Sequence, residues 1–145
     1  MGQYHIAVNI DRKEYVHPHE LGDGLKLLEQ AYSGPGGLAT ALHVLLAVCS
    51  RRGGGDYGSE HPLASEIVGR WGGDRIGVVG DYYQPGDLPV EHPDVFTLAM
   101  EEWTNITPSV REYLAEGIDD YHHALRYSGD GWLDREFSIE RRAGR

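Results

Sequence analysis

The stretch YHIAVNIDRKEYVH, residues 4–17, decides the fold of this chain. Every second residue of its first half is apolar: Tyr4, Ile6, Val8 and Ile10. A period of two is typical of a β-strand with one buried face. The polar run 11–14 can turn the chain, and residues 15–17 can then return as a second strand. We therefore predict a β-hairpin over these residues.

Helical spacing follows the hairpin. Apolar residues recur every three or four positions at Leu21, Leu25, Leu28 and Tyr32. This spacing predicts a helix with one apolar face, which Asp23 would cap at its N-terminus and residues 33–35 would end. Residues 38–50 are apolar nearly all round. They predict a second helix, buried in the core.

The second half of the chain repeats this order of elements. EIVGRW, residues 66–71, and RIGVVGDYY, residues 75–83, flank a Gly-Gly-Asp turn and predict a second hairpin. Pro93 and the pair Thr107-Pro108 are typical of helix starts.

The order ββαα-ββαα predicts the α+β class, with an antiparallel sheet made from two hairpins and packed with about four helices. We expect a single domain over residues 1–127. Residues 128–145 would form a C-terminal tail that is partly docked and frayed at its end.

Composition excludes some classes of function. Lys and Arg total 13 against 23 Asp and Glu, so the net charge is −10 and binding to a nucleic-acid polymer is not expected. Cys49 is the only cysteine, so no internal disulfide can form. No apolar run is long enough to span a bilayer, and the start of the sequence lacks a secretion signal. We expect a cytoplasmic protein that does not bind membranes.

The segment HPHELGD, residues 17–23, is the first candidate site. His17 and His19 are two residues apart, so both rings could lie on one side of an extended segment, close to Asp23. Two imidazoles and a carboxylate would suit zinc, manganese or iron. The same residues could instead contact an organic or anionic ligand. In the simplest alternative, Asp23 only caps a helix and the histidines are solvated.

The glycine-rich segment RRGGGD, residues 51–56, is the second candidate. Backbone N–H groups at Gly53 and Gly54 could hold an anion, and the guanidinium groups of Arg51 and Arg52 could bind phosphate oxygens. The segment follows a helix instead of preceding one, so it lacks the helix N-terminus of a P-loop. Its arginines could equally complement the end of the preceding helix. Asp56 and Asp81 adjoin glycine-rich backbone that a ligand could approach.

Several motifs together resemble a family of small uncharacterised proteins of phages and bacteria, including actinobacteria. They are MGQYHIAVNIDRKEYVHPHELGDGLKLLE, RGGGD, IVGRWGGDRIGVVGDY and WTNIT. The resemblance covers residues 1 to 110, and its first motif is the most specific. It implies an accessory role, in a mobile element for example. It assigns no activity, cofactor or site residue.

Three hypotheses of function remain open. In the first, the chain is a non-catalytic binding protein for a small anionic or nucleotide-like ligand, held by HPHELGD, RRGGGD and the segment that ends at Asp81. In the second, it is a metal-dependent hydrolase with His17, His19 and Asp23 as ligands. In the third, it is an acidic interaction or inhibitor module. No cofactor is expected. A protein partner, or a homodimer through an open sheet edge, stays an open alternative.

Overall fold

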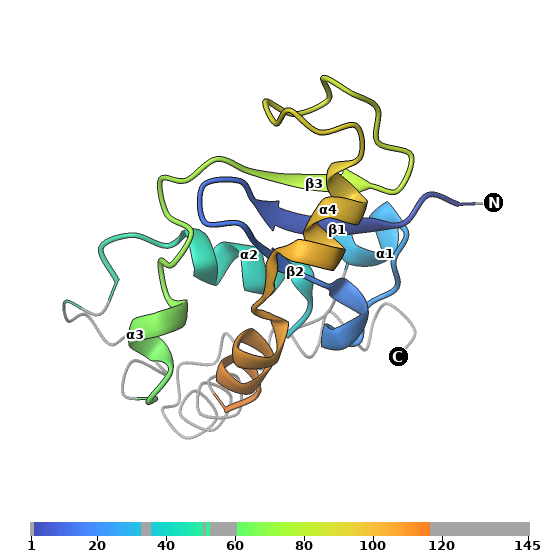
Figure 1. Ribbon diagram of the computed structural model, residues 1–145. Coiled ribbons are helices and arrows are strands. Elements are labelled where there is room, and N and C mark those ends of the chain that lie inside the picture. Colours follow the sequence, from blue (N-terminus) through green and yellow to red (C-terminus); the bar gives the residue numbers. More distant parts are fainter. Residues whose placement is uncertain (1, 33–35, 51, 53–60, 117–145) are drawn as a thin grey trace, which may run out of the picture.

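The N-terminal hairpin forms as the alternation predicts. Strand β1 (His5–Asn9) pairs antiparallel with β2 (Glu14–Val16), and Val8 lies opposite Tyr15. Lys13 adopts a left-handed backbone conformation, with φ of 55°, in the turn that joins them. The computed structural model, shown in Figure 1, describes residues 2–32, 36–50, 52 and 61–116.

The hairpin is the centre of a mixed sheet with the order β3-β1-β2-β4. Strand β3 (Ile76–Gly80) pairs antiparallel with β1, and the short β4 (Thr104–Asn105) pairs parallel with β2. The predicted α+β class is therefore confirmed in general terms. The prediction that two antiparallel hairpins make the sheet is wrong in its second half, because β3 pairs with β1 across more than sixty intervening residues.

The segment 66–71 does not form the strand that we predicted. It contains the end of helix α3 (Ala64–Ile67) and a series of turns that leads to β3. Ile67 and Trp71 are both buried, and a spacing of four is helical. A short apolar run does not distinguish a strand from a helical turn, and here the helical turn is preferred.

The predicted first helix is divided. A 3₁₀ helix, η1 (Pro18–Leu21), ends at Gly22 with φ of 89°, and α1 (Leu27–Ala31) begins only after the non-helical residues 23–26. Leu28 and Tyr32, which were expected to face the core, are 66% and 84% exposed. Glycine supplied the backbone freedom that ended the helix early.

Helix α2 (Leu38–Leu46) is buried as predicted but ends before residue 47. Helix α4 (Val95–Glu102) starts two residues later than predicted, since Asp94 is its N-cap and accepts from the backbone N–H of Thr97. Residues 107–116 are helical as well. The predicted continuation of that helix, the tail 128–145 and the domain boundary at residue 127 lie outside the described residues.

Helices cover both faces of the sheet, as Figure 1 shows. On one face Ala7 and Val16 pack in a core with residues of α2, α3 and 107–116. On the other face Ile6, Val8 and Val79 pack against α4. Because β1 is covered on both sides, its residues 6–9 are all buried. No described helix is long and apolar enough to cross a membrane.

Candidate functional site

Backbone hydrogen bonds fix the segment HPHELGD in place. The N–H of His17 donates to Oγ1 of Thr107 at 2.8 Å, and residues 18–21 form η1. The rings of His17 and His19 meet edge to face, with centroids 6.4 Å apart. Burial lowers the pKa of His17, and its Nδ1 has no hydrogen-bond partner among the described residues. His19, by contrast, is exposed.

Asp23 has a structural partner. Its carboxylate accepts from the backbone N–H of Leu38 at 2.7 Å, at the first turn of α2. It therefore caps the second helix and not the one that follows it directly in sequence, which corrects our prediction. Among the described residues, the ligand atoms of Asp23, His17 and His19 do not all lie within 4.8 Å of one another. These three side chains are therefore not placed to hold one metal ion.

Beyond HPHELGD, the structure describes two members of the predicted anion site, Arg52 and Asp81, and no hydrogen bond or ion pair joins these two described residues. Asp81 exchanges two contacts with Tyr4: its carboxylate accepts from the Tyr4 N–H at 2.9 Å, and its own N–H donates to the Tyr4 carbonyl at 2.9 Å. Arg52 is exposed. The remaining residues lie outside the described part of the chain: Arg51, Gly53, Gly54 and Asp56.

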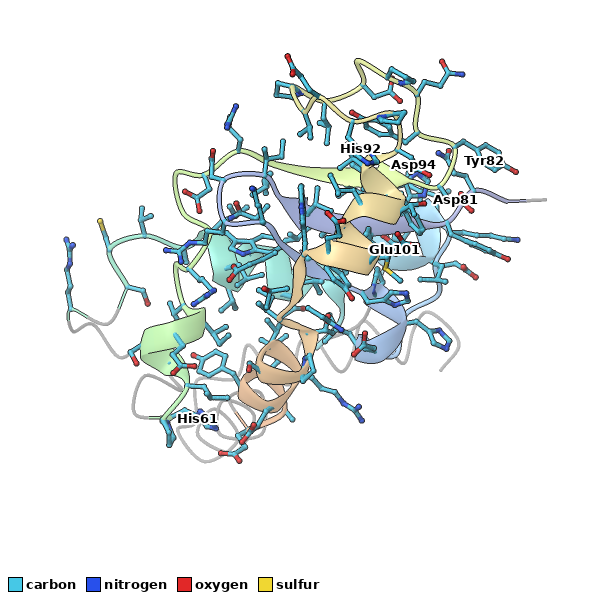
Figure 2. All side chains as sticks on the ribbon, in the orientation of Figure 1. His61, Asp81, Tyr82, His92, Asp94 and Glu101 are labelled. Carbon is cyan, nitrogen blue, oxygen red and sulfur yellow. The ribbon has the colours of Figure 1, made fainter. Side chains whose placement is uncertain are left out.

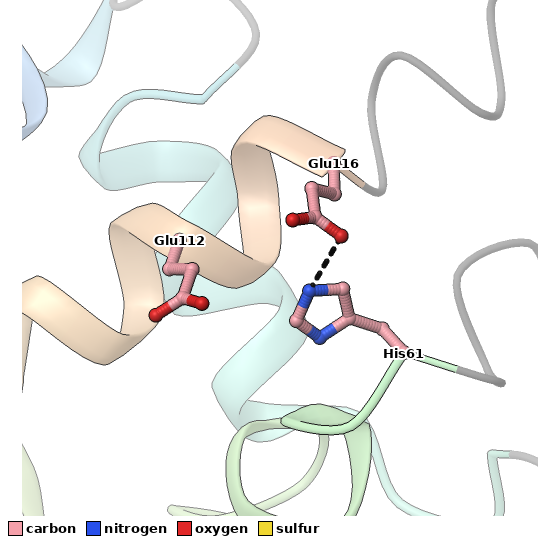
Figure 3. Close-up of side chains that lie close together, drawn as sticks. All are labelled: His61, Glu112 and Glu116. Carbon is pink, nitrogen blue, oxygen red and sulfur yellow. Dashed lines mark ion pairs between the residues drawn. The ribbon is translucent and has the colours of Figure 1, made fainter.

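A cluster that the sequence analysis missed joins His61 to the helix at 107–116. Glu112 and Glu116 are four residues apart on that helix, and their ligand atoms lie within 4.8 Å of that of His61 (Figure 3). Nε2 of His61 lies 2.8 Å from a carboxylate oxygen of Glu116. The pair of glutamates at helical spacing was visible in the sequence, but nothing there connected it to His61. Figure 2 places His61 across the molecule from Asp81.

The hydrogen bonds of His61 favour a His–Glu pair over a metal centre. Nδ1 accepts from the backbone N–H of Leu63 at 3.0 Å, so the ring proton of neutral His61 is on Nε2 and points to Glu116. A histidine that binds a metal normally donates a proton from its other ring nitrogen. The ring also packs edge to face on Tyr113, with centroids 5.5 Å apart. This cluster attaches residue 61 to the helix.

A second polar cluster is buried under the hairpin. Glu14, which is 5% exposed, accepts hydrogen bonds from Nε of Arg70 and from Nε1 of Trp71, each at 2.9 Å. Nearby, Asp74 accepts from Nδ2 of the buried Asn9 at 2.9 Å. All these charged groups have partners, which is typical of a cluster that positions a segment.

Two hollows in the described surface lack a cation for an anionic ligand. One, of about 170 Å³, lies between α1, α2 and β3, and Gln30 is its only polar side chain. The other, of about 620 Å³, lies within the proline-rich segment 85–93, where Glu91 and His92 are the ionisable residues. Neither is lined by Lys or Arg.

Most large apolar side chains that the described residues expose lie around α1 and β3. We call this region the α1–β3 surface and define it by six residues: Tyr4, Leu27, Leu28, Tyr32, Val78 and Tyr82. Leu27 and Val78 line the smaller hollow together. Val78 is 43% exposed although it occupies the centre of a strand.

Comparison with known proteins finds no family model, no curated protein and no solved structure that matches this chain. The resemblance to phage and bacterial proteins therefore stays a prediction.

Proposed function

We propose that this protein is a non-catalytic interaction module that binds a protein chain through the α1–β3 surface. One observation carries the proposal: large apolar side chains are exposed together around a strand at the edge of the sheet. Contiguous exposed apolar side chains of this kind typically mark an interaction site.

The edge of β3 adds a reason to choose a protein as the partner. Among the described residues, β3 is the first strand in the sheet order and has a neighbouring strand on one side only. The backbone groups on its other side can bind an extended segment of another chain, while the apolar side chains around it supply pockets. A small anionic ligand would find neither a cation nor an enclosed cavity there.

Peptides selected from a random displayed library against the protein would test this function. We expect the selected peptides to alternate apolar and polar residues. Their affinity, measured by fluorescence polarisation, should fall more than about tenfold for Leu28→Lys, because a charge would replace one of the most exposed apolar side chains of the α1–β3 surface. Val48→Lys is the matched control, since Val48 is 67% exposed and lies outside the α1–β3 surface. Equal affinity for both variants would contradict the proposal.

The small-ligand hypothesis keeps a separate test, because four of its residues lie outside the described part of the chain. Native mass spectrometry of gently purified protein would reveal a bound nucleotide-like ligand as an excess mass that is lost on denaturation. A transition metal would appear as a smaller excess and would favour the hydrolase hypothesis. A mass equal to that of the chain would count against both.

A further inference from the structure

We propose that the partner at the β3 edge is a second copy of this chain, paired antiparallel with β3 about a two-fold axis at Val78. This inference rests on the proposed function, because it names the protein that the α1–β3 surface binds. Three features of β3 support it: the direction of its free backbone groups, its end charges and its exposed side chain.

The backbone of Val78 points away from the sheet. Hydrogen bonds link Ile10 to Arg75 and Asp81 to Tyr4 at the two ends of the β1–β3 ladder. Antiparallel pairs alternate between bonded and non-bonded, so the backbone groups of residues 77 and 79 also face β1. Those of residues 76, 78 and 80 therefore face outward. Among the described residues, no hydrogen bond reaches the backbone of Val78 from outside the sheet.

A two-fold axis at Val78 satisfies these groups reciprocally. The N–H and carbonyl of Val78 in one copy would bond with the carbonyl and N–H of Val78 in the other. In this register Ile76 lies opposite Gly80, whose N–H is also directed outward, while its carbonyl already accepts from the N–H of Tyr83. A closed dimer needs such a self-complementary surface, and a strand paired with itself antiparallel provides one.

The charges at the ends of β3 fit the same register. With Val78 opposite Val78, Arg75 of one copy lies opposite Asp81 of the other, and symmetry produces this pair at both ends of the ladder. Within its own copy Arg75 binds Asp11 at 2.7 Å and Asp81 accepts from the N–H of Tyr4, so the pair between copies would add to these contacts. Residues directly opposite one another have their side chains on the same face, where opposite charges attract. A parallel arrangement would instead bring like charges together.

The apolar side chains would meet across the axis. Val78 and Ile76 have their side chains on the α1 and α2 face of the sheet, and Val78 lines the hollow with Leu27. The axis at Val78 therefore places the α1–β3 surfaces of the two copies next to each other. Pairing would also remove an open apolar edge, which otherwise favours aggregation.

Light scattering after size exclusion, on full-length protein from about 1 to about 100 µM, tests the dimer by mass action. We expect the mass of a dimer at the upper end. Val78→Lys should raise the dissociation constant more than about tenfold, since lysine on an edge strand opposes pairing. Val48→Lys should leave it unchanged. A monomer at every concentration, or equal effects of the two substitutions, would overturn the proposal.

A disulfide tests the register. In the hydrogen-bonded pair expected here, the two Cα atoms would lie about 5.5 Å apart, which a disulfide can bridge. Cys49→Ser/Val78→Cys should therefore form a covalent dimer on oxidation, and Cys49→Ser/Val48→Cys should not. The charge pair gives a second readout: Asp81→Asn should weaken the dimer, because it removes the charge that faces Arg75 of the other copy and keeps an acceptor for the N–H of Tyr4. No disulfide, together with a dimer that Asp81→Asn leaves unchanged, would overturn the register.

The two proposals fail in different ways. If the chain is monomeric but selected peptides still lose affinity for Leu28→Lys, the surface binds another protein and only the homodimer is wrong. If Leu28→Lys also leaves the affinity of the peptides unchanged, the proposed function is wrong as well.

Discussion

Glu14 is the residue on which the packing of the segment after α3 depends. It lies in the short strand β2, where burial of a carboxylate is costly unless hydrogen bonds compensate. Arg70 and Trp71 supply those bonds and so attach the chain before β3 to the hairpin. Four residues after Arg70, Asp74 makes a second connection to the hairpin, because its carboxylate accepts a hydrogen bond from Asn9.

Glu14→Gln should lower the free energy of unfolding by about 2 kcal/mol, because a charged hydrogen-bond network loses its acceptor. Burial raises the pKa of Glu14, but the hydrogen bonds from Arg70 and Trp71 outweigh it and hold the pKa below 4.5. The stabilisation is therefore present above pH 4.5 and is lost as the pH falls through the lower folded value. Urea denaturation across this range checks the effect. An equal pH slope in the variant would contradict it.

Asp23→Ala should lower the free energy of unfolding by about 1 kcal/mol, because the first turn of α2 loses its side-chain acceptor. His19→Ala is the control, since His19 is exposed and should change stability little. Chemical denaturation measures both. If the two substitutions cost the same, Asp23 does not act as a cap.

At the scale of elements, the end of α2 and the turn after α3 form a close backbone junction. The N–H of Gly69 donates to the carbonyl of Val44 at 3.0 Å, and the N–H of Trp71 donates to that of Leu45 at 2.8 Å. These bonds satisfy carbonyls that the helix end leaves free. They explain why 68–71 runs along α2 and not along β3.

Gly69→Ala should destabilise the fold more than Gly73→Ala does. Both glycines have positive φ, of 75° and 81°, so each alanine incurs the cost of a left-handed backbone, about 1 kcal/mol. A Cβ at residue 69 would also lie 2.6 Å from the carbonyl oxygen of Ala47, whereas one at residue 73 would meet nothing within 4 Å. Thermal denaturation of the two variants isolates the clash. Equal losses would contradict the close junction.

At the scale of the whole molecule, the net charge of −10 opposes compactness. Raising NaCl from about 20 to about 300 mM should therefore raise the melting temperature by a few degrees, because screening weakens the repulsion. The Val78→Lys variant should respond in the same way, which separates this effect from association. A melting temperature that falls with salt would show that attractive ion pairs dominate.

The sequence itself predicted those elements whose pattern is local. The alternation through residues 4–10 specified β1, the apolar run from Leu38 specified α2, and the positions of Pro93 and Thr107 indicated two helix starts to within a residue or two. These signals work because backbone preference and side-chain period agree over a single short segment.

The candidate site was less accessible to the same reasoning. HPHELGD places residue types that commonly bind metals at neighbouring positions. In the structure, however, Asp23 accepts from the backbone N–H of Leu38, and His17 donates its backbone N–H to Thr107. Residue type and spacing do not reveal that these groups form hydrogen bonds with other parts of the same chain. His61 and Glu116 come together from different segments and have no sequence signal at all.

The sequence alone determined the α+β class, the hairpin and the buried second helix, because short-range periodicity fixes each of them. Only the tertiary structure decided that β3 pairs with β1, that 66–71 is not a strand, and that Val78 lies exposed at the sheet edge. The physical reason is that strand pairing and exposure depend on contacts between residues far apart in the chain. Those contacts are selected by the burial of both faces of β1, which no single segment encodes.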